Sequence, residues 1–261
     1  MIKISIIIPA YNEEKRIGPT LEKYSNFLNK IKNSSKINYE ILVVINNTKD
    51  RTKEIVKKYQ KIDKNIKYLD LKEGGKGLAV KKGFIDALKR NNDLIGFVDA
   101  DCSTSPEAFY DLITNLGDYD GSIASRYMKK SIVQPKQTLP RIIVSRIFNF
   151  AIRSLFFMPY SDTQCGAKIF KRKPIEKVVG VLEITKWAFD VELLYKIRKL
   201  GFKIKEVPTV WSDREYSKIN FANAGPKMLL AIVRLRLINS RLNLIVRLYD
   251  KLNRLLKKGE K

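Results

Sequence analysis

The sequence predicts an α/β protein with a mostly parallel central sheet flanked by helices. Over the first hundred residues, short β-branched runs alternate with segments whose apolar residues recur at helical spacing. Such alternation is typical of βαβ units, whose strands lie parallel in one sheet. Hydrophobic residues make up 44% of the 261 residues, which is enough for one large domain or for a domain with an appendage.

The first βαβ unit is predicted from three segments. Residues 3–9 form a β-branched run closed by Pro9 and are expected to be a buried strand. Residues 13–32 follow with the apolar spacing of a helix, and 39–45 form a second strand-like run. A helix near 50–60 continues the alternation.

The pattern goes on with a strand near 66–71 and a helix over about 76–91. That helix is opened by three glycines, Gly74, Gly75 and Gly77. A further strand covers 93–99 and ends at Asp99. Ser105-Pro106-Glu107 then predicts a helix start, because Ser favours the N-cap and Pro the first helical position.

Two segments of the second half, 141–157 and about 226–258, mix bulky apolar residues with Lys and Arg. A basic amphipathic helix of this kind is typical of a membrane interface, but it also fits a helix packed on the sheet with its basic residues outward. Both alternatives stay open for 141–157. The almost entirely positive charge of the C-terminal segment favours the membrane interface.

The charge balance is strongly basic, with 51 Lys and Arg against 27 Asp and Glu and a formal net charge of +24. This excess predicts a polyanionic partner, such as nucleic acid, anionic lipid headgroups or a phosphorylated substrate. No nucleic-acid-binding module is recognisable, so no nucleic acid partner is expected. The absence of His excludes His general bases, His metal ligands and Ser-His-Asp triads.

The cysteines, the N-terminal residues and the lengths of the apolar runs indicate in which cellular compartment the protein is expected. Cys102 and Cys165 form neither a zinc spacing nor a disulfide framework, which fits a reducing compartment. The N-terminus runs directly into the first predicted strand, with no signal-peptide pattern. No stretch reaches about 18 uninterrupted apolar residues, so no transmembrane helix is expected.

Two carboxylates follow the predicted strand 93–99 in the sequence Asp99-Ala100-Asp101. Parallel sheets bind ligands beyond the carboxyl ends of their strands. Two carboxylates at such an end can hold Mg²⁺ or Mn²⁺, which then bridges a diphosphate. The alternative is a loop in which an Asp caps the helix from 105.

Two other segments are expected at the same edge of the sheet. Residues 9–14, Pro-Ala-Tyr-Asn-Glu-Glu, follow the first strand, where polar side chains could contact a base and ribose or cap the next helix. Gly74-Gly75-Lys76-Gly77 joins a strand to a helix, and a Lys at a helix N-terminus favours phosphate. The alternative is an ordinary turn, because the spacing of a P-loop or a dinucleotide fingerprint is absent.

In this order, these segments and Ser125-Arg126-Tyr127 resemble the nucleotide-binding half of family 2 glycosyltransferases. The stretches 162–172, Asp-Thr-Gln-Cys-Gly-Ala-Lys-Ile-Phe-Lys-Arg, and 187–195, Trp-Ala-Phe-Asp-Val-Glu-Leu-Leu-Tyr, resemble the branch of dolichyl-phosphate glucosyltransferases and mannose synthases. The resemblance spans 3–238 and is closer to the glucosyl branch, in part through the segment at Trp211.

The resemblance implies a nucleotide-diphospho-sugar transferase fold of the GT-A type, with a basic amphipathic C-terminal helix. Residues 1–225 would form the catalytic domain, with a nucleotide-sugar-binding half at 1–128 and an acceptor-side half at 129–225. Residues 226–261 would form a membrane-interface helix, so that the enzyme binds peripherally at the cytoplasmic face of the cell membrane.

Site residues follow from the same resemblance. The implied catalytic residues are Asp99, Asp101, Asp162 and Gln164, with Cys165 in the same acceptor-side loop. The first two would also hold Mg²⁺ or Mn²⁺. The implied donor-binding residues are Pro9, Tyr11, Glu13, Asn46, Lys76, Asp99 and Arg126. The implied contacts of the acceptor phosphate are Arg126, Ser217 and Lys218.

One segment departs from the family pattern. The family has an Asp-Asp-Gly-Ser stretch after the second strand, whose acidic residue contacts the base. Here the stretch is Ile45-Asn46-Asn47-Thr48, and only Asp50 is kept. The base is therefore inferred from the glucosyl resemblance, which favours UDP over GDP.

The implied reaction is inverting transfer of a sugar, with glucose from UDP-glucose as the first candidate, to a polyprenyl or dolichyl phosphate. The product would be a lipid-phosphate-sugar donor for glycan or protein glycosylation. A phosphate monoester is already anionic and needs no strong general base, which suits a chain without His. The barrier lies in bringing two anions together, and metal charge and Lys or Arg side chains lower it.

Four alternatives remain at this point. The donor could be GDP-mannose, or the acceptor a sugar hydroxyl, for which Asp162 or Asp190 could serve as the base. The chain could also be a basic nucleic-acid-binding protein. Finally, the unusual Asn46-Asn47 stretch leaves open a non-catalytic nucleotide-sugar-binding protein. The expected partners are the nucleotide-sugar donor, the polyprenyl phosphate acceptor and an anionic membrane surface, with a membrane partner subunit as a further candidate.

Overall fold

A computed structural model of the chain describes residues 1–135, 139–183, 188–212, 221–244, 246 and 248. Its centre is a seven-stranded sheet in the order β3-β2-β1-β4-β7-β5-β8, accompanied by a two-stranded sheet of β6 and β9. The strands are β1 (Ile2–Ala10), β2 (Ile37–Asn46), β3 (Ile66–Leu71), β4 (Leu94–Phe97), β5 (Gly121–Ser125), β6 (Ile132–Gln134), β7 (Lys168–Lys171), β8 (Ile204–Pro208) and β9 (Val210–Ser212). The helices are α1 (Ile17–Ile31), α2 (Thr52–Ile62), α3 (Lys76–Lys89), α4 (Pro106–Thr114), α5 (Leu139–Phe156), α6 (Arg172–Val179), α7 (Phe189–Lys199) and α8 (Phe221–Ile238).

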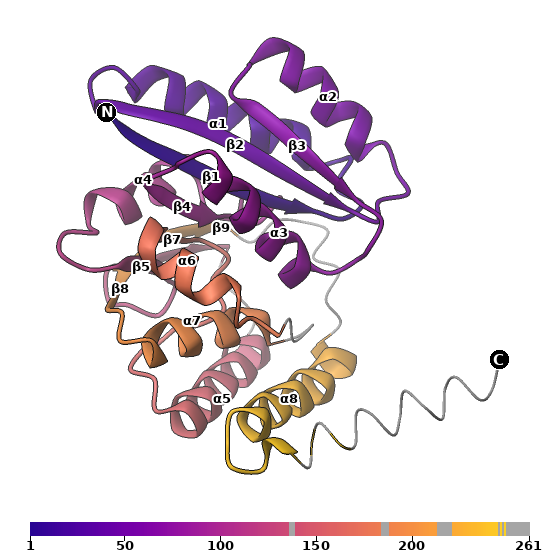
Figure 1. Cartoon of the computed structure of the whole chain (residues 1–261), viewed down its shortest axis with the longest axis vertical. Helices are drawn as coiled ribbons and strands as arrows, with labels where there is room; N and C mark the ends of the chain where they lie inside the picture. The colour runs from indigo at the N-terminus through magenta and orange to yellow at the C-terminus, as the bar shows by residue number, and fades with distance from the viewer. Residues whose placement is uncertain (136–138, 184–187, 213–220, 245, 247, 249–261) are drawn as a thin grey trace.

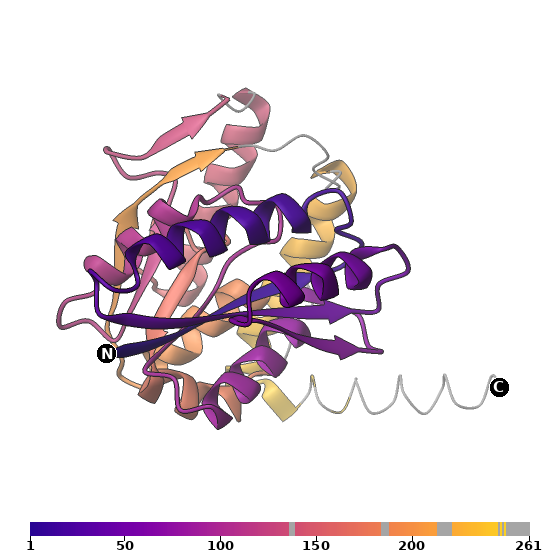
Figure 2. The ribbon, with the colours of Figure 1, turned by 90° about the horizontal axis from the view of Figure 1, so that it is seen from above.

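The sheet is buried on both faces, because helices cover both of them (Figures 1 and 2). Helices α1, α2 and α4 contribute to the apolar cluster on one face, and α3, α5, α6, α7 and α8 contribute to the cluster on the other. Strands β1 and β2 are buried along most of their length, as expected for parallel strands between two helical layers. The predicted α/β architecture is confirmed.

The register of the parallel strands brings their carboxyl ends to one edge of the sheet. Strand β1 pairs with β2 from Ile2 opposite Ile37 to Ala10 opposite Ile45. Strand β4 pairs in parallel with the other side of β1. The residues that follow β1, β2 and β4 are therefore neighbours in space, although they lie far apart in the sequence.

Strand β7 runs antiparallel to both of its neighbours, β4 and β5. Its first residue, Lys168, pairs with Phe97 at the carboxyl end of β4. Because β7 runs the opposite way, the segment 161–167 that leads into it lies at the same edge as the ends of β1, β2 and β4. Strand β7 therefore brings one segment of the second half of the sequence to the candidate site.

Helices α5 and α8 contact each other at one end of the molecule (Figure 1). The sequence predicted one helix over about 226–258, but α8 ends at Ile238 and a turn follows. The Asn239 and Ser240 side chains donate to main-chain carbonyls of the preceding turn, and Ser240 Oγ accepts from the Leu242 amide. Such local bonds compete with the helix ladder, and they explain the break.

None of the helices in the described part of the chain combines the length and the hydropathy that crossing a membrane would require.

Candidate functional site

Asp99 and Asp101 stand in the loop after β4, at the carboxyl edge of the sheet. The Asp99 side chain is 39% exposed. The Asp101 Oδ1 atom accepts a hydrogen bond of 2.9 Å from the Ser103 amide. Helix α4 is capped by Ser105, whose Oγ accepts from the Ala108 amide. Helix capping therefore accounts for Ser105 and does not explain the two carboxylates.

Gly166 makes room for the Asp99 carboxylate. A Cβ on Gly166 would lie 1.8 Å from Asp99 Oδ2 and 2.4 Å from Cγ, far inside van der Waals contact. The loop before β7 thus lies directly against the proposed metal ligand, and only a glycine fits there. Gly166 was not singled out from the sequence, although it lies in the stretch 162–172 that carries the family resemblance.

Lys76 opens α3, and its ammonium group lies near the Asp99 and Asp190 carboxylates. The Lys76 Nζ atom lies 2.7 Å from Asp99 Oδ1 and 3.6 Å from Asp190 Oδ2. A Cβ on Gly77 would lie 2.8 Å from the Phe189 ring, so this glycine allows α3 to approach α7. The glycine turn therefore brings Lys76 beside Asp190. Burial alone would lower the pKa of Lys76, but Asp190 and Asp99 outweigh it and raise that pKa.

Lys168 and Asp190 form an ion pair next to Lys76. The Lys168 side chain is fully buried, and its Nζ atom donates to Asp190 Oδ1 and to the Cys165 carbonyl, at 2.6 Å in each case. Burial would raise the pKa of Asp190, but the Lys168 and Lys76 ammonium groups hold it below its ordinary value. Asp190 is thus a fixed carboxylate with both oxygens near cations.

The pKa of Asp99 is shifted in the other direction. Burial raises this pKa, Lys76 opposes the shift and the nearby Asp101 carboxylate adds to it. Two adjacent carboxylates are oxygen ligands of the kind that a hard divalent cation takes. Among the described residues, no group of three or more His, Cys, Asp or Glu could hold a metal by itself. The two carboxylates suit Mg²⁺ or Mn²⁺ whose remaining ligands are phosphate oxygens and water.

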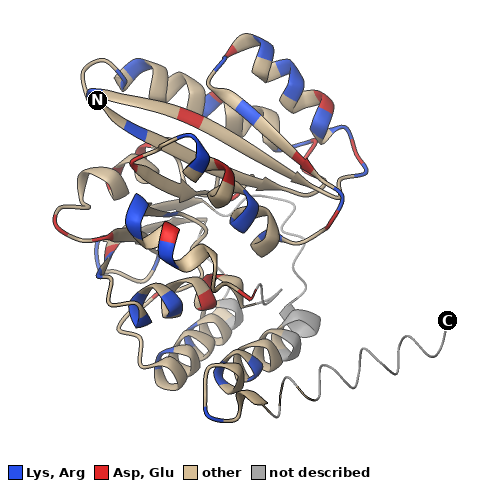
Figure 3. Ribbon diagram, viewed as in Figure 1, with Lys and Arg blue, Asp and Glu red and all other residues tan. Residues whose placement is uncertain are grey.

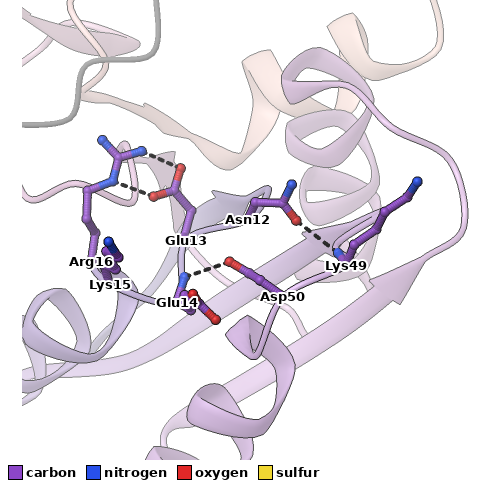
Figure 4. A pocket seen from close by; sticks show the side chains of 7 residues that line it. All are labelled: Asn12, Glu13, Glu14, Lys15, Arg16, Lys49 and Asp50. Carbon is purple, nitrogen blue, oxygen red and sulfur yellow. Dashed lines mark hydrogen bonds and ion pairs between the residues drawn. The ribbon is translucent and has the colours of Figure 1, made fainter.

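A cavity of about 360 Å³ lies beside the ends of β1 and β2 (Figure 4). It is lined by Asn12, Glu13, Glu14, Lys15, Arg16, Lys49 and Asp50. The Glu13 carboxylate receives two hydrogen bonds from the Arg16 guanidinium, at 2.6 and 2.7 Å. Arg16 was not singled out from the sequence, and Glu13, Asp101 and Asp99 all raise its pKa against the effect of burial.

The other predicted nucleoside contacts lie at the same edge. Pro9 pairs with Val44 inside the sheet, and Tyr11 is half exposed just beyond β1. Asn46 ends β2 with a side chain that is almost fully buried, and no described residue donates to its Oδ1 atom. Asn47 adopts a φ of 50°, which suits the glycine of the family pattern.

The acceptor-side residues are built around a second buried ion pair. Asp162 is fully buried and accepts five hydrogen bonds, three of them from Arg126 and two from the amides of Gln164 and Cys165. Burial would raise the pKa of Asp162, but Arg126 holds it below its ordinary value. A carboxylate held in this way is a poor proton acceptor.

Aromatic rings surround the Arg126 guanidinium, which lies 5.5 Å from the Tyr127 ring centroid and 5.4 Å from that of Trp211. Arg146 of α5 lies 5.0 Å from the centroid of the same Tyr127 ring. This contact was not predicted from the sequence, and it brings a cation of α5 to the ring that also packs on Arg126. The pair Ser217 and Lys218 lies outside the described residues.

Burial and the Asp162 charge raise the pKa of the Cys165 thiol to about 11. It is therefore protonated at neutral pH and is not a nucleophile. Gln164 lies between Asp162 and Cys165, with its side chain partly exposed at the same edge.

Several known proteins resemble the chain in sequence. The family model described as "Glycosyl transferase family 2" matches residues 5–179. The chain is 34% identical over 245 residues to the dolichyl-phosphate beta-glucosyltransferase of Dictyostelium discoideum, a match that covers 90% of this chain and 74% of the relative. It is 32% identical to the enzyme of the same name from Drosophila melanogaster, over 84% of this chain and 69% of the relative.

Among solved structures, the chain resembles glucosyl-3-phosphoglycerate synthase from Mycobacterium tuberculosis in complex with Mn²⁺, UDP and phosphoglyceric acid. The TM-score is 0.64 at 15% identity, and the match covers 90% of this chain and 78% of that one. At this identity the likeness concerns the fold, and it agrees with the GT-A type predicted from the sequence.

Proposed function

The chain belongs to glycosyl transferase family 2 and is a glycosyltransferase, and we propose that it transfers glucose from UDP-glucose to a polyprenyl or dolichyl phosphate. The observation that carries this proposal is the match over 90% of the chain to a dolichyl-phosphate beta-glucosyltransferase. The site geometry supports it, since Lys76 contacts Asp99 two positions before Asp101, at the sheet edge where we expect a metal-bound diphosphate.

Each part of the site has a role in this reaction. Bound Mg²⁺ or Mn²⁺ would neutralise charge on the leaving diphosphate. Asp99 and Asp101 would hold it, and Lys76 would add a further positive charge. A phosphate oxygen of the acceptor attacks the anomeric carbon, and the bond from that carbon to the diphosphate oxygen breaks. The nucleoside diphosphate leaves with the electron pair, and the α-linked donor gives a β-linked product.

The acceptor side then has no need of a general base. Asp162, which is locked to Arg126 and two amides, positions the loop 161–165. Arg126 is fixed between Asp162 and two aromatic rings, so its charge stays at the edge of the site. There we expect it, with Arg146, to attract the acceptor phosphate.

A donor screen tests the function. With polyprenyl phosphate as acceptor, we expect radiolabel to pass into the lipid fraction from UDP-glucose and much less from GDP-mannose. Calorimetry should show tighter binding of UDP than of GDP in the presence of Mn²⁺. Tighter binding of GDP would reverse the choice of donor, and labelling of a free sugar in place of the lipid would point to a hydroxyl acceptor.

The enzyme would meet its lipid substrate as a peripheral protein at the cytoplasmic face of a membrane. The support comes from α5 and α8, whose charged residues are all Lys or Arg. Both helices bury one face and leave large apolar side chains exposed on the other, among them Ile147, Phe150, Leu229 and Leu230. Apolar insertion flanked by positive charge is the pattern of an interfacial helix, and Figure 3 shows the blue bands on both helices.

Flotation with anionic vesicles tests this membrane contact. We expect the protein to float with the vesicles at low salt and to be released as salt rises, since each basic residue near the surface contributes about 1 kcal/mol. Phe150→Glu and Leu230→Glu should each weaken flotation. Ile62→Glu on α2 is the matched control, because Ile62 is 71% exposed and the other two residues are 70% exposed.

Point substitutions are preferable to removal of 226–261, because Ile232 and Leu235 of α8 are part of the core. A full-length protein that stays unbound beside anionic vesicles at low salt would contradict the membrane contact. The lipid would then have to be delivered by a partner subunit.

A further inference from the structure

Lys76 lies against the Oδ1 atom of Asp99, and Gly166 lies against the Oδ2 atom, so a divalent cation that approaches Asp99 would compete with Lys76. Its ammonium group lies 2.7 Å from Asp99 Oδ1, and about a third of each side chain remains exposed to solvent. An ammonium group and a metal ion compete for the same carboxylate lone pairs. A metal that binds Asp99 through Oδ1 would therefore displace Lys76 at least in part.

Asp190 offers Lys76 a second anion beside the first. The Asp190 Oδ2 atom lies 3.6 Å from Lys76 Nζ, while its Oδ1 atom is held at 2.6 Å by Lys168. Lys168 is itself fixed, because it is fully buried and also donates to the Cys165 carbonyl. Asp190 is therefore held in place by Lys168. It remains beside the site as a second anionic partner for Lys76 when Lys76 leaves Asp99.

The charges at this point nearly balance without a metal. Three carboxylates, Asp99, Asp101 and Asp190, face two ammonium groups, Lys76 and Lys168. A divalent cation added alone would make the group positive and would also be repelled by Lys76. A cation that arrives with a diphosphate brings its own negative charge, and the diphosphate provides a new partner for Lys76.

We propose that Lys76 is a built-in counter-ion that keeps divalent cations off Asp99 in the free enzyme and moves to the donor diphosphate when metal and nucleotide bind together. Lys168 and Asp190 are the positioning residues that hold Lys76 beside the site during the exchange. The inference rests on the proposed function in two respects, namely that Asp99 is a metal ligand and that the donor carries a diphosphate. Binding of metal and nucleotide is then coupled, and the coupling is reciprocal.

The test measures Mn²⁺ binding to the folded enzyme without any nucleotide, by the loss of the electron paramagnetic resonance signal of free Mn²⁺. Lys76→Gln and Lys76→Met remove the charge and should bind Mn²⁺ roughly tenfold or more tightly than the wild type, because a unit charge beside the cation is lost. Lys76→Arg keeps the charge and should keep the weak binding. Lys82→Gln removes an exposed charge from the same helix and should behave as the wild type does.

The same variants are then titrated with UDP at saturating Mn²⁺. We expect Lys76→Gln and Lys76→Met to bind UDP at least several-fold more weakly, so the two affinities move in opposite directions. Unchanged or weaker Mn²⁺ binding in both neutral variants, with wild-type circular dichroism, would overturn the counter-ion role. If the Mn²⁺ result holds but no lipid-linked sugar forms, the proposed acceptor fails while this inference stands.

Discussion

Asn in place of Asp101 is expected to lower turnover at least about 100-fold, because a catalytic metal supplies several kcal/mol of charge stabilisation. Asn has the same shape, and its Oδ1 atom can still accept from the Ser103 amide, so the loop after β4 should keep its form. What is lost is the negative charge that, with Asp99, draws in the cation. A chelator should abolish the activity of the wild type for the same reason.

Asp111→Asn is the matched control for this variant. Asp111 lies on the exposed side of α4, ten positions along the chain, and its replacement makes the same change in net charge. We expect it to retain wild-type turnover in the same assay with UDP-glucose and polyprenyl phosphate. Turnover of Asp101→Asn at the wild-type level, with Mg²⁺ or Mn²⁺ present, would remove Asp101 from the metal site.

The sheet edge could be predicted because its signals are local. The strand run before Asp99 and the strand run before residues 9–14 are visible in the sequence, and parallel pairing brings their ends together. The Ser105 cap could be predicted for the same reason, since capping depends on neighbours along the chain.

What escaped prediction depends on contacts between distant segments. Lys168 and Asp190 are separated by 22 positions, and they meet because β7 runs antiparallel and α7 packs against α3. Nothing in their spacing distinguishes this buried pair from two surface charges. The close approach of Gly77 to the Phe189 ring likewise joins two helices that are distant in the sequence. The break after α8 depends on two side chains, Asn239 and Ser240, in a segment that otherwise has helical periodicity.

Ala in place of Gly166 is expected to reduce turnover by about 100-fold, the effect of displacing a reacting group by roughly 1 Å. The new Cβ would lie 1.8 Å from Asp99 Oδ2, so the carboxylate or the loop before β7 must move. Gly166 does not need a positive φ, so Ala fits its backbone and the strain falls on Asp99. Affinity for UDP in the presence of Mn²⁺ should fall together with turnover.

Gly180→Ala separates this local effect from a general loss of helix or loop geometry. Gly180 follows α6, has a negative φ, and would place its Cβ in open space. The Gly180→Ala variant should therefore keep the turnover and the melting temperature of the wild type. The Gly166 variant should melt within a few degrees of the wild type, because the displaced carboxylate is partly exposed and can turn toward solvent. Normal turnover of the Gly166→Ala variant would show that Asp99 does not act from its position against the loop before β7. The metal would then have to be held by Asp101 with other ligands.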